Sequence, residues 1–224
     1  YLDALIRYNK AMTQRNVLRK GDLEPDDELM RVWEDMMAAC GEVVYKKRCK
    51  FIEEFIPTFQ AFYSYISQDK EQVSLAYESH AMQGSLLQQL IDSRQRDRIM
   101  GYSLKGIHKD DLSMSLGDYP IKKEGSQGQN KTYLIALKLA QFDFLRRTGS
   151  NTTPLLLLDD IFDKLDASRV EQIVKLVAGD RFGQIFITDT NRDHLDKILK
   201  KIEGEYKVFG VSDGMIEERG DTEE

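Results

Sequence analysis

The sequence predicts a molecule in two parts, a helical arm followed by an α/β domain whose sheet has helices on its faces. Residues 1–70 repeat apolar side chains at helical spacing, whereas residues 71–224 alternate short apolar runs with helical stretches. Such alternation is typical of a sheet covered by helices, and the 41% of residues that are apolar suffice for a sizeable core. The predicted domains are therefore the helical arm, 1–70, and the α/β part, 71–224.

Two long helices are predicted in the arm. The first ends at Gly21, a residue type that favours helix ends, and the second begins near residues 25–27, whose acidic side chains suit a helix N-terminus. The apolar stripe of the second helix continues to Ile66, and Pro57 is expected to kink or interrupt it. Consecutive long helices with a short loop favour an antiparallel hairpin that projects from a globular body. An ordinary helical bundle is the alternative.

The second part contains the periodic segments of an α/β fold. Its strands are short apolar runs, and the pair Gly117-Asp118 favours a hairpin turn. The strands are expected at 73–77, 155–158 and 184–188, the hairpins at 111–122 and around Val208 and Met215, and the helices at 86–100, 129–147, 168–177 and 192–200.

The charge balance restricts the ways in which this chain can bind nucleic acid. A net charge of −6 gives no general attraction to phosphate. Because phosphate binding needs clustered Lys and Arg, any DNA contact must come from a local basic patch. A solvated charged face is the alternative interpretation of such residues. The candidates are Arg94, Arg96, Arg98, Lys105, Lys122 and Lys123.

Cysteine content and hydropathy indicate a cytoplasmic protein with no membrane attachment. Cys40 and Cys49 fall on one predicted helix, too far apart along it for a disulfide, and are expected to be reduced thiols. No apolar run is long enough to cross a bilayer, and no secretory signal is visible. The chain opens on Tyr1 in helical pattern and without an initiator Met, as expected of a fragment.

The strongest local signal for chemistry is an apolar strand that ends in two acids. Residues 155–158 are four leucines, and Asp159 and Asp160 follow them. Ligands of open α/β sheets bind at the carboxyl ends of strands, and two adjacent carboxylates repel each other unless a cation or proton compensates. In a Walker B element the first acid holds Mg²⁺ and the second orients the attacking water. A strand that ends in a helix-capping Asp is the simpler alternative.

Two further segments support the Walker B interpretation. Leu165-Asp166, shortly after Asp160, matches the D-loop that crosses the dimer interface in ABC-type ATPases, and Asp163 belongs to the same segment. Asp166 is also suited to cap the next helix. Ser126 and Gly128 precede a helix whose open N–H groups suit an anion, with Lys131 adding charge, which is the layout of an ABC signature motif. A plain helix cap is the alternative for this segment.

The end of the next predicted strand and a missing phosphate-binding loop also bear on the function. Many ABC-type ATPases place a histidine after the strand predicted here at 184–188, where this chain has Thr188. Thr188 is a candidate contact for the γ-phosphate of ATP, and packing at a strand end is an equal alternative. The sequence contains no Gly-x-x-x-x-Gly-Lys-Ser/Thr, the loop that cradles ATP phosphates. We therefore expect the Walker A half to lie N-terminal to this chain, and no ATP turnover by the chain itself.

Together these motifs resemble the RecF family of SMC-like, ABC-type ATPases. The resemblance rests on residues 126–131, 154–160 and 165–166, on Gln14-Arg15-Asn16 near the start, and on residues 106–112, which are similar to the family's Gly-Pro-His-Arg-Asp-Asp-Leu. It therefore extends over nearly the whole chain. The sequence departs from the family pattern in having Ile107 for Pro, Lys109 for Arg and Asn130 for Gln or another polar residue. Lys109 keeps the charge but loses the bidentate fork of Arg.

The resemblance implies a fold, a set of partners and a role for each matching residue. The fold would be the C-terminal half of an ABC-type ATPase head of the P-loop superfamily, with a helical arm. ATP and Mg²⁺ would be the cofactors of the full-length protein, which would form an ATP-dependent homodimer, hydrolyse ATP slowly, bind double-stranded DNA at single-strand gaps, and act with RecR, RecO and RecA. Asp159 would hold Mg²⁺ through water, and Asp160 would be the catalytic carboxylate. The implied contacts to ATP across the dimer are Ser126, Gln127, Gly128, Gln129 and Lys131, those of the dimer interface are Asp163 and Asp166, and His108 and Lys109 are further DNA candidates.

Two other function classes remain open at this point. A nucleotide-binding subunit of a transporter is disfavoured because the signature segment lacks Leu-Ser-Gly-Gly-Gln and no histidine directly follows Thr188. A non-enzymatic scaffold in which Asp159 and Asp160 are vestigial is the third hypothesis.

Overall fold

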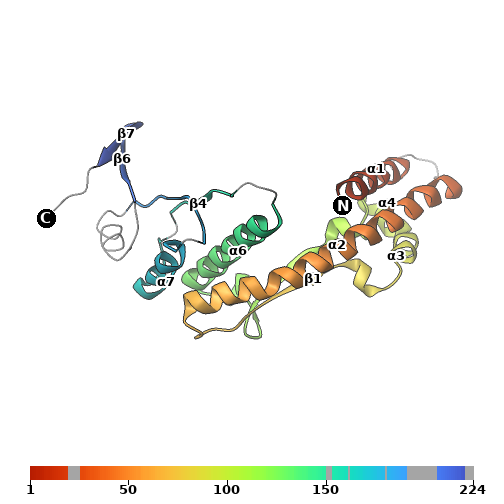
Figure 1. The fold of residues 1–224 in the computed structure, drawn as a ribbon. Helices are drawn as coiled ribbons and strands as arrows, with labels where there is room; N and C mark the ends of the chain where they lie inside the picture. The colour runs from red at the N-terminus through yellow and green to blue at the C-terminus, as the bar shows by residue number, and fades with distance from the viewer. Residues whose placement is uncertain (20–25, 150–152, 161, 180, 191–205, 220–224) are drawn as a thin grey trace. The chain divides into compact units, whose positions relative to one another are not determined.

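The computed structural model describes residues 1–19, 26–149, 153–160, 162–179, 181–190 and 206–219 (Figure 1). Contacts between residues group the chain into two compact units, Tyr1–Gln141 and Phe142–Glu224. Among the described residues, no helix combines the length and the apolar character needed to cross a bilayer.

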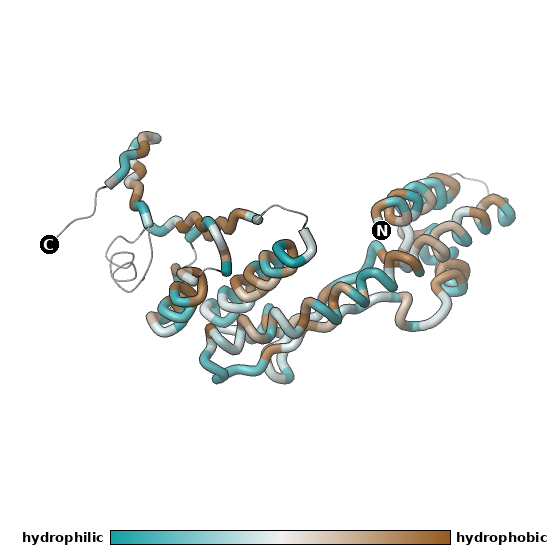
Figure 2. The backbone as a smooth tube through the Cα atoms, viewed as in Figure 1, coloured by the Kyte–Doolittle hydropathy of each residue, from teal (hydrophilic) through white to brown (hydrophobic). Residues whose placement is uncertain are grey.

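The first unit begins with an antiparallel pair of helices. α1 spans Leu2–Leu18 and α2 spans Asp27–Ser67, and α1 packs along the first half of α2 (Figure 1). Arg15 on α1 pairs with Glu34, whereas Tyr8, two turns earlier, lies against Gly41, which fixes the antiparallel direction. Apolar and polar residues alternate along α2, as the banding in Figure 2 shows.

α2 is one continuous helix of 41 residues, so of the kink or interruption predicted at Pro57 the interruption is wrong. The Asp26 carboxylate accepts a hydrogen bond from Glu28 N at 2.8 Å and so caps the N-terminus. Pro57 is exposed, whereas Phe55 and Phe59 on either side of it are buried. Burial of the apolar face maintains the helix where the proline removes one backbone hydrogen bond.

Two groups of buried side chains form the core of the first unit. Around the α1–α2 contact the group includes Tyr8, Met37 and Val44, together with Leu90 and Ile107 from later segments. The second group is aromatic and lies along the other half of α2. There Phe59 and Tyr63 pack against Tyr133, with ring centroids 4.7 Å apart for Phe59 and Tyr133.

A small antiparallel sheet and four short helices complete this packing. The sheet has the order β1-β2-β3, with β1 at Val73–Glu78, β2 at Asp111–Leu116 and β3 at Tyr119–Pro120. The predicted helix over 86–100 is two helices that meet at Ser93, whose hydroxyl bonds the Asp97 carboxylate at 2.8 Å. The short helices are η1 at His80–Gln83, α3 at Leu86–Asp92, α4 at Arg94–Met100 and η2 at Ile107–Lys109.

The chain then passes through two helices into the second unit. α5 spans Ile121–Glu124, and α6 spans Gln127–Thr148. β4 at Leu156–Leu158 and β5 at Ile185–Ile187 form a parallel pair, and α7 at Ala167–Val177 buries its apolar face. A hairpin of β6 at Val208–Ser212 and β7 at Met215–Arg219 follows. The helix predicted at 192–200 lies outside the described residues.

The parallel pair is covered on one face only by the described residues. Leu156 and Leu158 are buried, but Leu157 is 71% exposed and its partner across the pair, Phe186, is 49% exposed. The described residues thus leave one face of this pair uncovered, whereas the sequence predicted a sheet with helices on its faces. Parallel sheets usually bury both faces, which makes this apolar face a surface that needs further protein.

Candidate nucleotide site

Two acids and a threonine meet where the parallel strands end. Asp159 and Asp160 directly follow β4, and Thr188 directly follows β5. Leu158 pairs with Ile187 in the parallel register, and Thr188 N donates to Leu158 O at 3.0 Å. The carboxyl ends of both strands therefore lie at one edge of the sheet, where α/β folds place ligands.

The Thr188 hydroxyl connects the two acids. It donates a hydrogen bond to Asp159 Oδ1 and accepts one from the Asp160 backbone N–H at 3.1 Å. Asp160 has a φ of +47°, in the left-handed region that Asp tolerates better than most residues. Both carboxylates are exposed, so water and a cation can reach them.

The donor set at this edge suits Mg²⁺ that also binds a phosphate. Mg²⁺ prefers oxygen ligands and is usually held by one or two carboxylates together with substrate phosphates and water. Within the described part of the chain, no group of three or more His, Cys, Asp or Glu side chains could hold a metal by itself. Asp159 and Asp160 therefore fit a metal that arrives with a nucleotide.

The segment after the acids turns sharply into α7. Leu165 N donates to Phe162 O at 3.2 Å, and Lys164 has a φ of +64°. Asp166 caps α7 by accepting from Arg169 N at 2.9 Å, and its second oxygen binds the Arg169 side chain at 3.1 Å. The capping interpretation of Asp166 thus has a structural basis, and the dimer-interface role of Asp163 and Asp166 stays a prediction.

The candidate signature segment forms the N-terminus of α6 in the first unit. Ser126 Oγ accepts from Gln129 N at 3.2 Å, and Gln129 Oε1 accepts from Ser126 N at 2.8 Å, which is a reciprocal capping box. The first turn of a helix leaves its N–H groups without helical partners, so those of Gln127 and Gly128 are the ones left to an anion at this helix end. Lys131 lies one turn further along and is half-buried.

Contacts from outside the motif fix this helix end in place. Gln129 Nε2 donates to Glu71 Oε1 at 2.9 Å, and the other Glu71 oxygen accepts from Tyr63 OH at 2.6 Å. Gly125 is required directly before the motif, because a Cβ there would lie 2.6 Å from Ile121 O. Glu71 belongs to none of the sequence motifs. Its contact with Gln129 identifies it as a residue that supports the N-terminus of α6.

The comparisons with known proteins agree on one family. No protein-family model matches the chain. The chain is 79% identical to the DNA replication and repair protein RecF of Phocaeicola vulgatus over 224 residues, 100% of this chain and 60% of that relative. RecF of Bacteroides thetaiotaomicron is 72% identical over 220 residues, and RecF of Parabacteroides distasonis is 56% identical over 217.

The chain belongs to the RecF family. A solved structure of the recombination mediator protein RecF-ATP in the RecFOR pathway matches it with a TM-score of 0.75 at 24% identity, covering 98% of this chain and 58% of that one. This likeness confirms the predicted fold class at the level of the fold, which is that of the corresponding part of the RecF-ATP structure. The chain spans about 60% of the length of the curated RecF proteins that it matches.

In this RecF-family chain, His108 links segments of the helical core. Tyr8 OH donates to His108 Nδ1 at 2.8 Å, and His108 Nε2 donates to Ser103 O at 2.9 Å. Burial lowers the pKa of His108, so the ring remains neutral at physiological pH. Gly106 has a φ of +133°, and a Cβ there would lie 2.1 Å from the Tyr8 hydroxyl. The Gly-x-His part of the RecF motif therefore has a packing role.

The rest of that RecF motif holds a second contact. Asp110 accepts from Arg48 and from the Tyr77 hydroxyl, and Arg48 also donates to Ile107 O at 2.8 Å. Burial and the hydrogen bond to Asp110 raise the pKa of Tyr77, so this phenol stays a donor. Lys109 lies outside the cluster, with its ammonium 5.0 Å from the centre of the Tyr102 ring.

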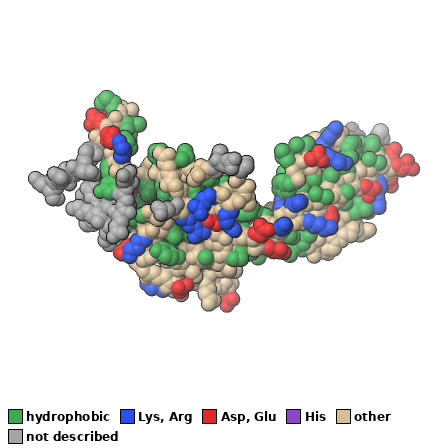
Figure 3. All heavy atoms as spheres, in the orientation of Figure 1, with side chains coloured by type: hydrophobic (Ala, Val, Ile, Leu, Met, Phe, Trp, Pro, Cys, Tyr) green, Lys and Arg blue, Asp and Glu red, His purple; other side chains and the backbone are tan. Residues whose placement is uncertain are grey.

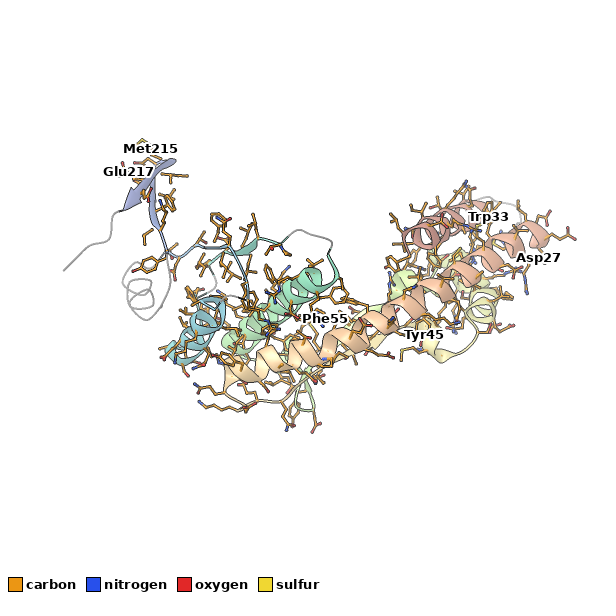
Figure 4. All side chains as sticks on the ribbon, viewed as in Figure 1. Asp27, Trp33, Tyr45, Phe55, Met215 and Glu217 are labelled. Atoms are coloured by element: carbon orange, nitrogen blue, oxygen red, sulfur yellow. The ribbon has the colours of Figure 1, made fainter. Side chains whose placement is uncertain are left out.

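The candidate DNA-binding arginines of this RecF-family chain differ in environment. Arg94 donates to Glu34 at 2.7 Å and to Asp27 at 2.9 Å, and the hydrogen bond to Glu34 raises the Arg94 pKa. Asp27 lies at the start of α2 (Figure 4). Arg96 is exposed. On the face drawn in Figure 3, Lys and Arg side chains of the helical part are interspersed with Asp and Glu.

Sequence reasoning missed the buried ionic cluster to which Arg94 belongs. Arg15, Glu34 and Asp97 have 0% exposed side chains, with Arg15 donating to Glu34 at 3.1 Å and to Asp97 at 2.8 Å. Arg19 also reaches Asp97, at 2.7 Å. The only sequence signal was the RecF resemblance of Gln14-Arg15-Asn16, which does not identify partners so distant along the chain.

Proposed function

We propose that this chain is part of an ATP-dependent RecF protein of the DNA replication and repair machinery. The full-length protein would act in the cytoplasm, dimerise on ATP, mark duplex DNA at single-strand gaps, and act with RecR and RecO in loading RecA. The observation that supports this most directly is the convergence of Asp159, Asp160 and Thr188 at the carboxyl edge of a parallel sheet, in a chain 79% identical to a RecF.

Each motif residue would have a defined role in that reaction. Mg²⁺ would neutralise charge on the β- and γ-phosphates of ATP. Asp159 would hold the metal through a water molecule. Asp160 would orient the attacking water and accept its proton, because an exposed carboxylate at this edge can reach a solvent molecule beside the phosphate. Hydrolysis would then reverse dimerisation.

The α6 N-terminus would bind the nucleotide of a second subunit. The N–H groups of Gln127 and Gly128, the Ser126 hydroxyl and the Lys131 ammonium would donate to the γ-phosphate, and Gln129 would hold the helix end in shape through its contact with Glu71. Asp163 and Asp166 would lie beside this contact. A site shared between subunits explains why ATP would be needed for the dimer to form.

The basic residues would supply a DNA contact independent of sequence. We assign phosphate contacts to Arg96, Arg98, Lys105 and Lys109. The bonds of Arg94 to Glu34 and Asp27, and those of the neutral His108 ring to Tyr8 and Ser103, commit these two side chains to the fold. Arg96→Ala in the full-length protein should weaken binding to duplexes of any sequence and reduce the salt dependence of binding. An unchanged salt dependence would remove Arg96 from the interface.

The decisive experiment uses the full-length protein and three variants. Wild type should form a dimer with ATP and Mg²⁺ in light scattering and bind a gapped duplex. Ser126→Arg should remain monomeric, since the larger side chain occupies the anion position at α6. Asp160→Asn should still dimerise but hydrolyse ATP about 10²–10⁴ times more slowly. Ser85→Arg is the matched control, because Ser85 caps α3 in the same unit.

The outcomes separate the hypotheses. Dimerisation of Ser126→Arg with ATP would refute the role assigned to α6. Wild type with neither an ATP-dependent dimer nor affinity for DNA would refute the proposed function and favour a scaffold.

A further inference from the structure

The Thr188 hydroxyl is engaged in two hydrogen bonds within the protein. A hydroxyl has one proton to donate and two lone pairs that accept. Here the proton is directed to Asp159 Oδ1, and one lone pair accepts from the Asp160 N–H at 3.1 Å. A residue that senses the γ-phosphate would have to direct that same proton to a phosphate oxygen. The two tasks compete for one hydrogen atom.

We propose that Thr188 is a positioning residue that fixes the carboxylate of Asp159 and the backbone of Asp160, and does not bind the γ-phosphate. The inference rests on the proposed function, because Asp159 and Asp160 have catalytic roles only if the protein hydrolyses ATP. It replaces the γ-phosphate contact, one of the two roles that the sequence left open for Thr188. Metal-binding carboxylates commonly depend on such hydrogen-bonded neighbours for their orientation.

The strand pairing makes Thr188 suitable for this task. Its backbone N–H donates to Leu158 O at 3.0 Å, directly before the acids, so the threonine is held in register with the residues that it orients. The side-chain bonds then continue the pairing beyond the last paired residues, Leu158 and Ile187. The acids are thereby tied to the neighbouring strand by two hydrogen bonds of the Thr188 side chain, next to the backbone bond between Thr188 and Leu158.

The conformation of Asp160 shows why its N–H needs a partner. Its φ of +47° is less stable than a right-handed conformation for a residue with a side chain. The acceptor that Thr188 provides for Asp160 N compensates in part for this strain. Loss of the hydroxyl would free the backbone of Asp160 to rotate and would release the Asp159 carboxylate at the same time. Both the metal ligand and the water-orienting group would lose their fixed geometry.

The test compares two substitutions in the full-length protein. Thr188→Val keeps the shape and removes the hydroxyl, and Thr188→Ser keeps the hydroxyl. We expect Thr188→Val to raise the Mg²⁺ concentration for half-maximal ATP hydrolysis about 10–100-fold, the usual effect of removing a residue that orients a metal ligand. ATP binding in EDTA should be unchanged, because a positioning residue does not touch the nucleotide. Thr188→Ser should restore the wild-type Mg²⁺ dependence.

A control variant and a folding measurement exclude a general structural effect. Thr148→Val removes a hydroxyl whose bond, to Phe144 O at 2.8 Å, lies within α6, and it should leave the Mg²⁺ dependence unchanged. Circular dichroism should show that all three variants fold. If Thr188→Val fails to fold, the comparison of Thr188→Ser with wild type still decides the matter, since a serine with an altered Mg²⁺ dependence contradicts the proposal.

The remaining outcomes are equally informative. A Thr188→Val protein with wild-type Mg²⁺ dependence but weaker ATP binding in EDTA would restore the sensor role and overturn this inference alone. A wild type without any Mg²⁺-dependent hydrolysis or dimer would refute the proposed function, and this inference with it.

Discussion

At the scale of single residues, the first unit buries a cluster of charged side chains centred on Arg15. Arg15 donates hydrogen bonds to Glu34, Asp97, Ser103 and the Leu90 carbonyl. Arg15 and these four partners are all buried. A buried ion pair adds little compared with apolar packing, but removal of one partner leaves an uncompensated charge. Removal of one charged member is therefore expected to destabilise the whole cluster.

Asp97→Asn should lower the free energy of unfolding by about 3–5 kcal/mol, because it leaves Arg15 and Arg19 buried without a full counter-charge. Chemical denaturation followed by circular dichroism measures the change. Asp92→Asn is the matched control, since Asp92 is exposed on the neighbouring helix and should change stability by less than about 0.5 kcal/mol. Equal effects of the two substitutions would show that the buried pair is not stabilised as described.

The pKa of the Asp97 carboxylate indicates how the stability of the fold should depend on pH. Burial alone would raise the pKa of Asp97, but hydrogen bonds from Arg15, the Leu104 N–H, Arg19 and Ser93 outweigh it and lower the pKa below its usual value. The folded pKa is thus below the unfolded one. The contribution of Asp97 is therefore complete above about pH 4 and is lost as the pH falls through the folded pKa.

Chemical denaturation at pH 7 and at pH 3 tests whether the pKa of Asp97 is lowered in the folded state. Wild type should lose more stability on acidification than Asp97→Asn does. A steeper acid dependence in the variant would contradict the direction of the shift.

At the scale of elements, sequence patterns predict helices and strands that depend on neighbouring residues. They fail where contacts with distant parts of the chain determine the structure. Strand positions and hairpin turns followed from apolar runs and turn residues, because those signals act within a few positions. The end of the hairpin predicted over 111–122 was wrong, since residues 121 and 122 begin α5. The break at Ser93 did not, since it depends on the Ser93 hydroxyl binding Asp97 inside a core built from other segments. Asp159 and Asp160 were predictable as a strand end, but their bonds to Thr188, 28 and 29 residues away, were not.

Pro57 offers a test of how strongly packing supports α2. A proline inside a helix costs about 3 kcal/mol or more, and part of that cost is offset because proline also restricts the unfolded chain. Pro57→Ala should therefore raise the free energy of unfolding by about 1–3 kcal/mol. Glu53→Ala, at an exposed position one turn earlier, should have little effect. If Pro57→Ala destabilises the protein, the packing of Phe55 and Phe59 requires the geometry that proline imposes.

At the scale of the whole molecule, the proposed ATPase function requires more than this chain. The chain has the acids proposed to act on Mg²⁺ and water and the helix end proposed to bind a phosphate, but its sequence lacks a Gly-x-x-x-x-Gly-Lys-Ser/Thr loop. We therefore expect the purified chain to hydrolyse no ATP above the rate of an Asp160→Asn preparation made in parallel. A malachite-green phosphate assay measures this. A rate in wild type that Asp160→Asn abolishes would show that the chain is catalytically self-sufficient.

The contact between Tyr8 and His108 also has a consequence for how the chain folds. It joins residues 100 positions apart, and the Arg15–Asp97 pair joins residues 82 apart. Proteins rich in helix normally fold fast because their contacts are local. A contact between distant residues forms more slowly, because closing the long loop costs entropy before the contact stabilises the fold. The first unit should accordingly acquire helix early and reach its native core late. Its refolding rate is expected to resemble that of a β-rich domain more than that of a helical bundle.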